Sequence, residues 1–181
     1  MGRAGSTFCW SVSVVVLAVD LYYILSTATI AEQVSVTIPA PREEVYAFFA
    51  TPRSLSKYQP LVTKTEEHKE KDGTHSYSVH EAIPIAFNFT FPSSVRVYPT
   101  KDEEKKEIRN KIVGEGLVGS LLTIHQSFQF EDVNGKETIV RDKLEGNVLR
   151  LLSYVVTSNW RHAHTSMLHA IKAEFQQQQQ R

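Results

Sequence analysis

The spacing of apolar residues changes abruptly near residue 145 of this 181-residue chain. Between residues 62 and 144, apolar side chains tend to recur at every second position, which is the period of a strand with one buried face. From residue 148 onward they recur at steps of three and four, which defines one long amphipathic helix. The apolar stripe of this helix consists of Val148, Leu152, Val155, Val156, Trp160, Ala163, Met167, Leu168, Ile171 and Phe175. The pattern predicts several strands packed against one helix over Val148–Phe175, with Gly146-Asn147 before it as the start signal.

Turn residues divide the region of period two into a series of strands. Asp72-Gly73 and Asn134-Gly135 are strong hairpin signals, and the mixed charges of residues 101–106 predict a further turn. The predicted strands cover residues 62–68, 75–83, 87–97, 108–113, 121–130 and 138–144. Strands joined by short turns in sequence order favour an antiparallel meander.

Residues 33–60 predict one further strand and two short helices before the meander. Apolar residues alternate through residues 33–38, and prolines end that strand. Residues 42–50 then carry two acidic residues in the first turn and an apolar face at helical spacing. Thr51 followed by Pro52 is typical of an N-cap and the first position of a second helix, which stops at Pro60.

An apolar segment precedes the domain, and its only charge between Phe8 and Ala31 is Asp20. Its length suits a transmembrane helix or uncleaved signal anchor. A cleaved signal peptide, with a small-x-small site at residues 26–28, is a second interpretation, and an extra soluble helix is a third. We therefore predict three parts: residues 1–31 as this segment, 32–176 as the domain, and 177–181 as a polar tail rich in glutamine.

The charges around the apolar segment predict its orientation. Arg3 and the amino terminus precede the segment, and Glu32 follows it, so the positive-inside rule puts the amino terminus in the cytosol. The expected protein is single-pass and membrane-associated through residues 8–31, with a lumenal or extracellular domain, or a secreted domain if residues 1–28 are removed. Asn88 in Asn-Phe-Thr is a weak glycosylation signal in agreement with this location.

Composition excludes some classes of function. The 20 basic and 20 acidic residues cancel, so the chain lacks the basic field expected of a nucleic-acid-binding protein. The only cysteine, Cys9, lies in the N-terminal apolar segment, which excludes a disulfide within one chain and a cysteine-based metal site. The histidine spacings match no zinc motif, and no P-loop, G-x-G-x-x-G or G-x-S-x-G sequence occurs. We therefore predict no metal, no cofactor and no catalytic set.

The order of elements resembles the START-like superfamily, which includes polyketide cyclases, plant pathogenesis-related allergens and coenzyme-Q-binding proteins. The residues that carry the resemblance are VSVTIPAPREEVYAFFATPRSLSKYQPLV, residues 34–62. Within them, Pro41, Val45, Tyr46 and Phe48 match the usual family entry, and Tyr58 precedes the following Pro-Leu-Val. The resemblance covers residues 33–175. It implies an α+β helix-grip fold, in which a curved antiparallel sheet of six or seven strands surrounds the C-terminal helix, with two short helices after the first strand. The N-terminal apolar helix is an addition to this pattern.

This resemblance also implies a pocket between sheet and helix that holds a lipid, quinone, sterol or polyketide. Ligand pockets are mostly apolar with a few placed polar groups. The candidate ligand-binding residues are Phe48, Tyr58, Tyr77, Phe87, Phe89, Phe91, Ile124, Phe128, Leu152, Val156, Trp160, His164 and Met167. For any single aromatic residue among them, an ordinary packed core is the favoured interpretation. A register error of one residue would exchange the strand candidates for their neighbours.

Three functions follow as hypotheses. The first is binding, and transfer, of a lipid or other hydrophobic small molecule without catalysis. The second is a cyclase or hydratase in the same pocket, for which Glu81 and Glu115 are a candidate carboxylate pair and His164 a candidate proton-transfer group. The third is an interaction module with a filled core, and the sequence does not specify its oligomeric state.

Overall fold

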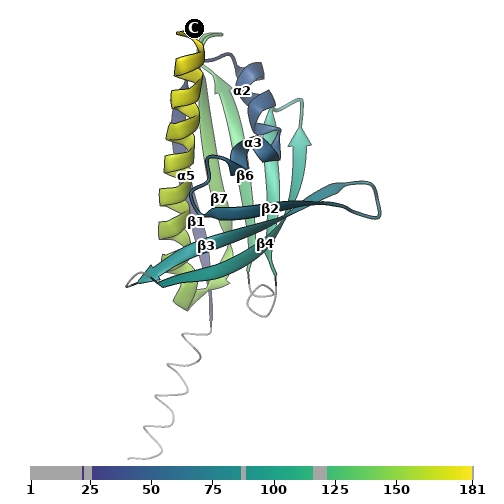
Figure 1. Ribbon diagram of the computed structural model, residues 1–181, viewed down its shortest axis with the longest axis vertical. Coiled ribbons are helices and arrows are strands. Elements are labelled where there is room, and N and C mark those ends of the chain that lie inside the picture. The colour runs from purple at the N-terminus through teal and green to yellow at the C-terminus, as the bar shows by residue number, and fades with distance from the viewer. Residues whose placement is uncertain (1–21, 23–25, 87–88, 116–121, 181) are drawn as a thin grey trace, which may run out of the picture.

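The computed structural model describes residues 22, 26–86, 89–115 and 122–180 (Figure 1). Along these residues the elements are β1 (Thr27–Ile38), α2 (Arg42–Phe49), α3 (Pro52–Ser56), β2 (Val62–Lys69), β3 (His75–Ala86), β4 (Phe89–Asp102), β5 (Glu107–Gly114), β6 (Thr123–Asp132), β7 (Thr138–Leu149) and α5 (Arg150–Gln178). The strands form one seven-stranded antiparallel sheet in the order β1-β7-β6-β5-β4-β3-β2. The predicted α+β architecture, with two short helices after the first strand and a long C-terminal helix, is confirmed.

The sheet curves around α5. Figure 1 shows α5 running alongside β1 and β7, whereas β2, β3 and β4 cross transversely to it. The helix packs mainly against β1. The short helices α2 and α3 lie at the C-terminal end of α5, while the first turns of α5 and the end of the β3–β4 hairpin lie at the opposite end (Figure 1). The sheet–helix sandwich therefore has two different ends, one of which is covered by the short helices.

The turns form where glycine follows a polar residue. Gly73 has φ +84° and Gly135 has φ +73°, in the left-handed region that glycine adopts without steric cost. Asp72 Oδ1 accepts a hydrogen bond of 2.9 Å from the backbone N–H of Thr74 and so stabilises the first turn. Both predicted hairpins are confirmed, β2–β3 at the first glycine and β6–β7 at the second.

Strand β1 begins at Thr27, earlier than the predicted start at Gln33. Its first half pairs with β7, from Thr27 opposite Leu149 to Ala31 opposite Glu145, and Ile30 is buried. Residues 27–31 are thus part of the sheet, although we assigned them to the N-terminal segment. Most of that segment, residues 1–21 and 23–25, lies outside the described residues. Within the part of the chain that the structure describes, no helix combines the length and the hydropathy needed to cross a bilayer.

The start of α5 corrects the sequence interpretation. Gly146 and Asn147, which we predicted to start the helix, lie in β7, and the helix begins at Arg150. A Cβ atom on Gly146 would lie 2.5 Å from the backbone oxygen of Thr123, so this glycine allows β6 to approach β7 closely. Val148, predicted on the helix stripe, is instead a fully buried strand residue. The strand persists because β1 and β6 both pair with this part of β7.

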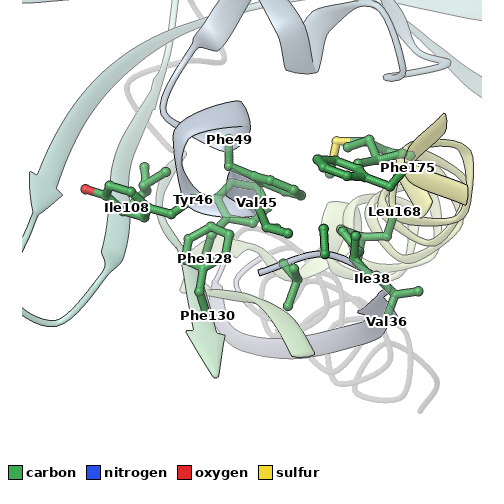
Figure 2. Packing of buried hydrophobic residues seen from close by; sticks show 14 residues of the cluster. Val36, Ile38, Val45, Tyr46, Phe49, Ile108, Phe128, Phe130, Leu168 and Phe175 are labelled. Carbon is green, nitrogen blue, oxygen red and sulfur yellow. The ribbon is translucent and has the colours of Figure 1, made fainter. Parts of the chain in front are cut away.

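The main hydrophobic core joins α2 and the second half of α5 to the sheet. Figure 2 shows Phe49 of α2 between Phe128 and Phe130 on one side and Phe175 of α5 on the other. The ring centroids of Phe49 lie 5.2 Å from Phe128 and 5.3 Å from Phe130, both edge to face. Such aromatic contacts contribute about 0.5–1.5 kcal/mol each beyond the area that they bury. This cluster fixes the short helices onto one end of the sheet.

A second, smaller core lies toward the start of α5. It consists of Ile30, Ile124, Leu144, Val148 and Trp160, from β1, β6, β7 and α5. The two clusters have no buried member in common. Between them the interior contains buried polar side chains, and these define the candidate site.

Candidate functional site

Two adjoining cavities lie between the curved sheet and α5. The first, chamber 1, encloses about 150 Å³ on the side of the short helices. The second, chamber 2, encloses about 130 Å³ on the side of the first half of α5. The residues that line both of them are Gln59, Glu81, Val95, Ile112 and His164. These shared walls make the two chambers neighbours that meet at a polar waist.

Each chamber has a distinct wall. Beyond the shared residues, chamber 1 is lined in part by Phe49, Leu55, Thr65, Tyr77, Val79, Val97, Ile108, Asn110 and Gln126. Chamber 2 is lined in part by Leu61, Ile83, Leu122, Ile124, Leu144, Val155, Val156, Asn159, Trp160 and Ala163. Chamber 1 thus carries more of the polar groups, whereas chamber 2 is mostly aliphatic.

A buried carboxylate holds the imidazole of the waist in place. Asp142 of β7 is fully buried, and its Oδ2 lies 2.5 Å from Nδ1 of His164 on α5. Gln59 places its Nε2 atom 3.1 Å from Nε2 of the same ring. Because an amide nitrogen donates, the ring Nε2 accepts, and Nδ1 carries the proton donated to Asp142. A buried carboxylate is costly unless it accepts such bonds, so the imidazole and Asp142 stabilise each other.

Two amide side chains extend this network across the sheet. Gln126 of β6 donates from Nε2 to Oδ1 of Asp142 at 3.0 Å, and its own Oε1 accepts from Asn110 of β5 at 3.1 Å. Asn110 and Gln126 are direct cross-strand partners. Strands β5, β6 and β7 therefore contribute one connected row of polar groups, which ends at His164.

Glu81 of β3 is the second ionisable group shared by the chambers. Its burial raises the pKa of the carboxyl above the ordinary value of 4.5. A carboxyl with a raised pKa keeps its proton at higher pH and can then donate a hydrogen bond. The waist thus contains an imidazole that accepts through Nε2 and a carboxyl whose pKa is raised by burial.

Two wall residues carry buried polar atoms that have no hydrogen-bond partner among the described residues. They are Oγ1 of Thr65 in chamber 1 and Nε1 of Trp160 in chamber 2. The indole of Trp160 stacks on the His164 ring, with 4.6 Å between centroids. Buried polar atoms in native proteins are nearly always paired. These two atoms are therefore open to a hydrogen bond with water or with a bound molecule.

Five of the sequence candidates line the chambers. Tyr77 lines chamber 1, Ile124, Val156 and Trp160 line chamber 2, and His164 lines both. Four others belong to the main core or pack against it instead: Phe48, Tyr58, Phe128 and Met167. Leu152 is half-buried on the first turn of α5 and is a wall residue of neither chamber.

Two candidates are exposed instead of facing the interior. Phe89 is 73% exposed and Phe91 is 47% exposed. Both precede Val95, where the pairing of β4 with β5 begins, so they lie on a hairpin that extends past the neighbouring strand. The alternation of residues alone does not reveal where a strand extends past its neighbour. Phe87 and the glycosylation candidate Asn88 lie outside the described residues.

The carboxylate pair proposed from the sequence does not form. Glu115 accepts from Ser94 at 2.6 Å and from Arg96 at 2.9 Å, away from the chamber walls. These contacts lower the pKa of Glu115, with the hydrogen bond from Ser94 as the largest cause and that from Arg96 next. Glu81 therefore shares the waist with His164 and not with Glu115.

Sequence reasoning missed Asp142, Gln126, Asn110 and Gln59. A signal was present for the first three, because each interrupts the apolar face of a strand. Asp142 lies between Val140 and Leu144 in the alternation, and Gln126 between Ile124 and Phe128. A polar residue at an inward position of a strand is the pattern that identifies this network. Within the described ranges, no group of three or more His, Cys, Asp or Glu side chains is placed to hold a metal ion.

Comparisons with known proteins identify the fold. No protein-family model matches the chain, and no curated protein matches it in sequence. Among solved structures, the Zhui aromatase/cyclase from Streptomyces sp. R1128 superposes with a TM-score of 0.65 at 12% identity, over 82% of this chain and 94% of that chain. The ginseng major latex-like protein 151 from Panax ginseng gives 0.63 at 17% identity, over 81% and 97%.

A third neighbour carries the family name itself. A START superfamily protein from Mycobacterium smegmatis superposes with a TM-score of 0.61 at 11% identity, over 81% of this chain and 97% of that chain. At such identities the agreement concerns the fold, and nearly the whole of each neighbour takes part. Together with the order of strands and the position of α5, these superpositions show that the chain has the START-like, helix-grip fold.

Proposed function

We propose that this chain binds a mainly apolar small molecule in the two chambers between the sheet and α5. The observation that carries the proposal is the pair of unpartnered polar atoms on the chamber walls, Thr65 Oγ1 and Trp160 Nε1. Leaving a buried polar group unpaired costs about 1–3 kcal/mol. A ligand oxygen that accepts from Trp160 would recover part of this free energy, while the aliphatic wall buries the apolar remainder.

The arrangement of the waist supports a particular kind of ligand. Polar groups concentrate where the chambers meet, at Gln59, Glu81 and His164, and apolar walls extend beyond them into chamber 2. A molecule with an oxygen-bearing group near its middle would match the polar waist. A hydrocarbon arm on one side of that group would match the apolar wall of chamber 2. Pockets for drug-sized ligands enclose about 300–1,000 Å³, and the chambers together are close to the lower limit. The ligand is therefore compact, or it enters with some movement of the walls.

A matched pair of variants tests this proposal. Thr65→Val removes the unpartnered hydroxyl from chamber 1 with little change in shape, whereas Tyr46→Phe removes a buried hydroxyl that is outside both chambers. Residues 26–181 would be purified from a eukaryotic host and analysed by native mass spectrometry, with extraction and identification of any bound molecule. We expect a co-purifying apolar ligand whose affinity falls about two- to tenfold in Thr65→Val, as for the loss of one hydrogen bond.

The control decides how a result is interpreted. Tyr46→Phe should bind the same ligand with unchanged affinity. Thr65→Val should also raise the stability of the ligand-free protein, because it removes a buried hydroxyl without a partner. A protein that carries no ligand and takes up none from a mixed library of lipids, quinones and sterols would refute the binding proposal and favour an interaction module.

A second candidate function, acid–base catalysis, rests on the Asp142–His164 pair and on Glu81. The Nε2 atom of His164 could take a proton from a carbon next to a carbonyl, while the protonated Glu81 donates its proton to the carbonyl oxygen and an enol forms. This is the chemistry of the cyclase or hydratase alternative. Such a reaction would exchange ligand hydrogen for deuterium in heavy water in the wild-type protein and not in His164→Gln. A ligand whose mass is unchanged after incubation with the wild type would refute catalysis of this kind and leave binding untouched.

A further inference from the structure

Large apolar side chains are exposed on two elements at one end of the molecule. On β4, Phe89 and Phe91 are 73% and 47% exposed, and on the first turns of α5, Leu151 and Tyr154 are 65% and 79% exposed. Single exposed apolar residues are ordinary, but a group of large ones at one place indicates an interaction surface. We call these four residues the apolar end.

The two elements of the apolar end lie side by side. The Nδ2 atom of Asn159, on the third turn of α5, donates to the backbone oxygen of Pro84 at 3.3 Å, and Pro84 pairs with Thr90 across the β3–β4 hairpin. Figure 1 shows the end of this hairpin beside the first half of α5. The exposed residues of the hairpin and of the helix therefore belong to one end of the domain.

The chain also enters the domain at this end. The backbone N–H of Arg150, the first residue of α5, donates to the oxygen of Ser26 at 2.8 Å, and Thr27 pairs with Leu149. The residues that precede Ser26 carry the long apolar run with the single charge of Asp20. A run of this length and composition is of the kind that bilayers accommodate. The most apolar part of the sequence is thus attached next to the apolar end.

We propose that the apolar end docks on the surface of a lipid bilayer, with the Phe89–Phe91 strand and the first turns of α5 in contact with the lipid. The attachment point of the apolar run favours a bilayer over a protein partner, because a run held in lipid brings this end, and not the opposite one, to the membrane. Aromatic side chains such as Tyr154 are favoured at the membrane interface. The opposite end, with α2 and the β6–β7 turn, faces away from the bilayer (Figure 1).

Docking in this orientation would shorten the path of an exchanging ligand, an inference that rests on the proposed function. The wall of chamber 2 contains Ile83 from the same hairpin and Val155 from the same turns of α5. Chamber 2 therefore lies directly behind the docking surface. An apolar ligand would pass between lipid and chamber 2 over a short path, without exposure to bulk water.

Fluorescence quenching in vesicles tests the docking independently of any ligand. The full chain carries Cys9→Ser, which removes its only cysteine. One new cysteine is then placed at Phe91, at Leu151 or, as the control, at Lys136 in the exposed β6–β7 turn. Each is labelled with an environment-sensitive dye and reconstituted in phosphatidylcholine vesicles that contain acyl-chain spin-labelled lipid. We expect a blue shift and strong quenching for Phe91→Cys and Leu151→Cys, and neither for Lys136→Cys.

Other outcomes refute the docking. Labels at Phe91 and Leu151 that stay unquenched, as at Lys136, would show that this end is in water. A blue shift that is already complete before lipid is added would show that the surface is covered by another part of the chain or by a second copy. Because the two test positions lie on different elements, a folding defect in one variant does not decide the result. Ligand binding by residues 26–181 is measured separately, so failure of docking leaves the proposed function intact.

Discussion

Two alanine-to-leucine substitutions distinguish a true cavity from a filled core. Ala163 on α5 and Ala40 after β1 are both 2% exposed, but only Ala163 lines a chamber. Leucine adds about three carbon atoms to alanine, and burial of each stabilises by about 0.8 kcal/mol. If the roughly 130 Å³ of chamber 2 accept these atoms, Ala163→Leu stabilises the protein by up to about 2.4 kcal/mol. Ala40→Leu meets a packed core and destabilises it by about 1–3 kcal/mol, the usual cost of overpacking.

Urea unfolding of residues 26–181 measures this difference, which we expect to lie between about 1 and 5 kcal/mol from the two magnitudes above. The same two variants also test ligand binding, because leucine at Ala163 occupies the volume that the apolar arm of a ligand would fill. Ala163→Leu should therefore lose uptake of the ligand, whereas Ala40→Leu should keep it. Equal destabilisation by the two variants would refute the reasoning, because it would mean that chamber 2 is not free to accept additional atoms.

Three further predictions concern the strands and the waist. The fragment 32–181 lacks Ile30, whose burial contributes about 1.5–3 kcal/mol. Its free energy of unfolding in urea should therefore be lower than that of residues 26–181 by at least this amount, and equal urea midpoints would contradict the prediction. Gly146→Ala should destabilise by about 1–3 kcal/mol, because its Cβ would lie 2.5 Å from the backbone oxygen of Thr123; an unchanged midpoint would contradict the close approach. Burial raises the pKa of Glu81 above 4.5, so its contribution to stability is full below that pH and is lost as the pH rises through the raised pKa. Glu81→Gln should then gain melting temperature relative to wild type between acidic and neutral pH, and a constant difference across that range would refute it.

The fold could be predicted because most of its elements carry a regular period. The steps of three and four between Trp160 and Phe175 match the buried face of α5, where Met167 and Ile171 are fully buried. Errors occurred where tertiary pairing overrode a local signal. Gly146 is a plausible helix start in isolation, but it is needed where β6 approaches β7, and the register of three strands is not visible in one local stretch.

The candidate site was less accessible to sequence reasoning because it is made of polar residues in apolar patterns. Aromatic side chains at inward positions were predicted to line the pocket. Phe128 is one of them, but it is packed in the main hydrophobic core. Aromatic residues fill space well, so a core and a pocket wall use the same residue types. Whether a hydrophobic side chain faces another or faces a cavity depends on the curvature of the sheet, which the alternation of residues does not encode.

Polar residues at inward positions are more informative than the aromatic ones, for a physical reason. Burying Asp142 and Gln126 costs desolvation that valine or leucine at these positions would not, and buried ion pairs can often be replaced by apolar residues without loss of stability. Stability alone therefore does not explain why β5, β6 and β7 each contribute a polar side chain to the row that ends at His164. The proposed oxygen-bearing ligand would explain these polar side chains. An apolar cavity cannot distinguish such a ligand from a hydrocarbon, whereas a site with buried hydrogen-bonding groups rejects a molecule that leaves them unpaired. Under the proposed function, the residues that disturb the apolar pattern of the strands are thus the ones that would select the ligand.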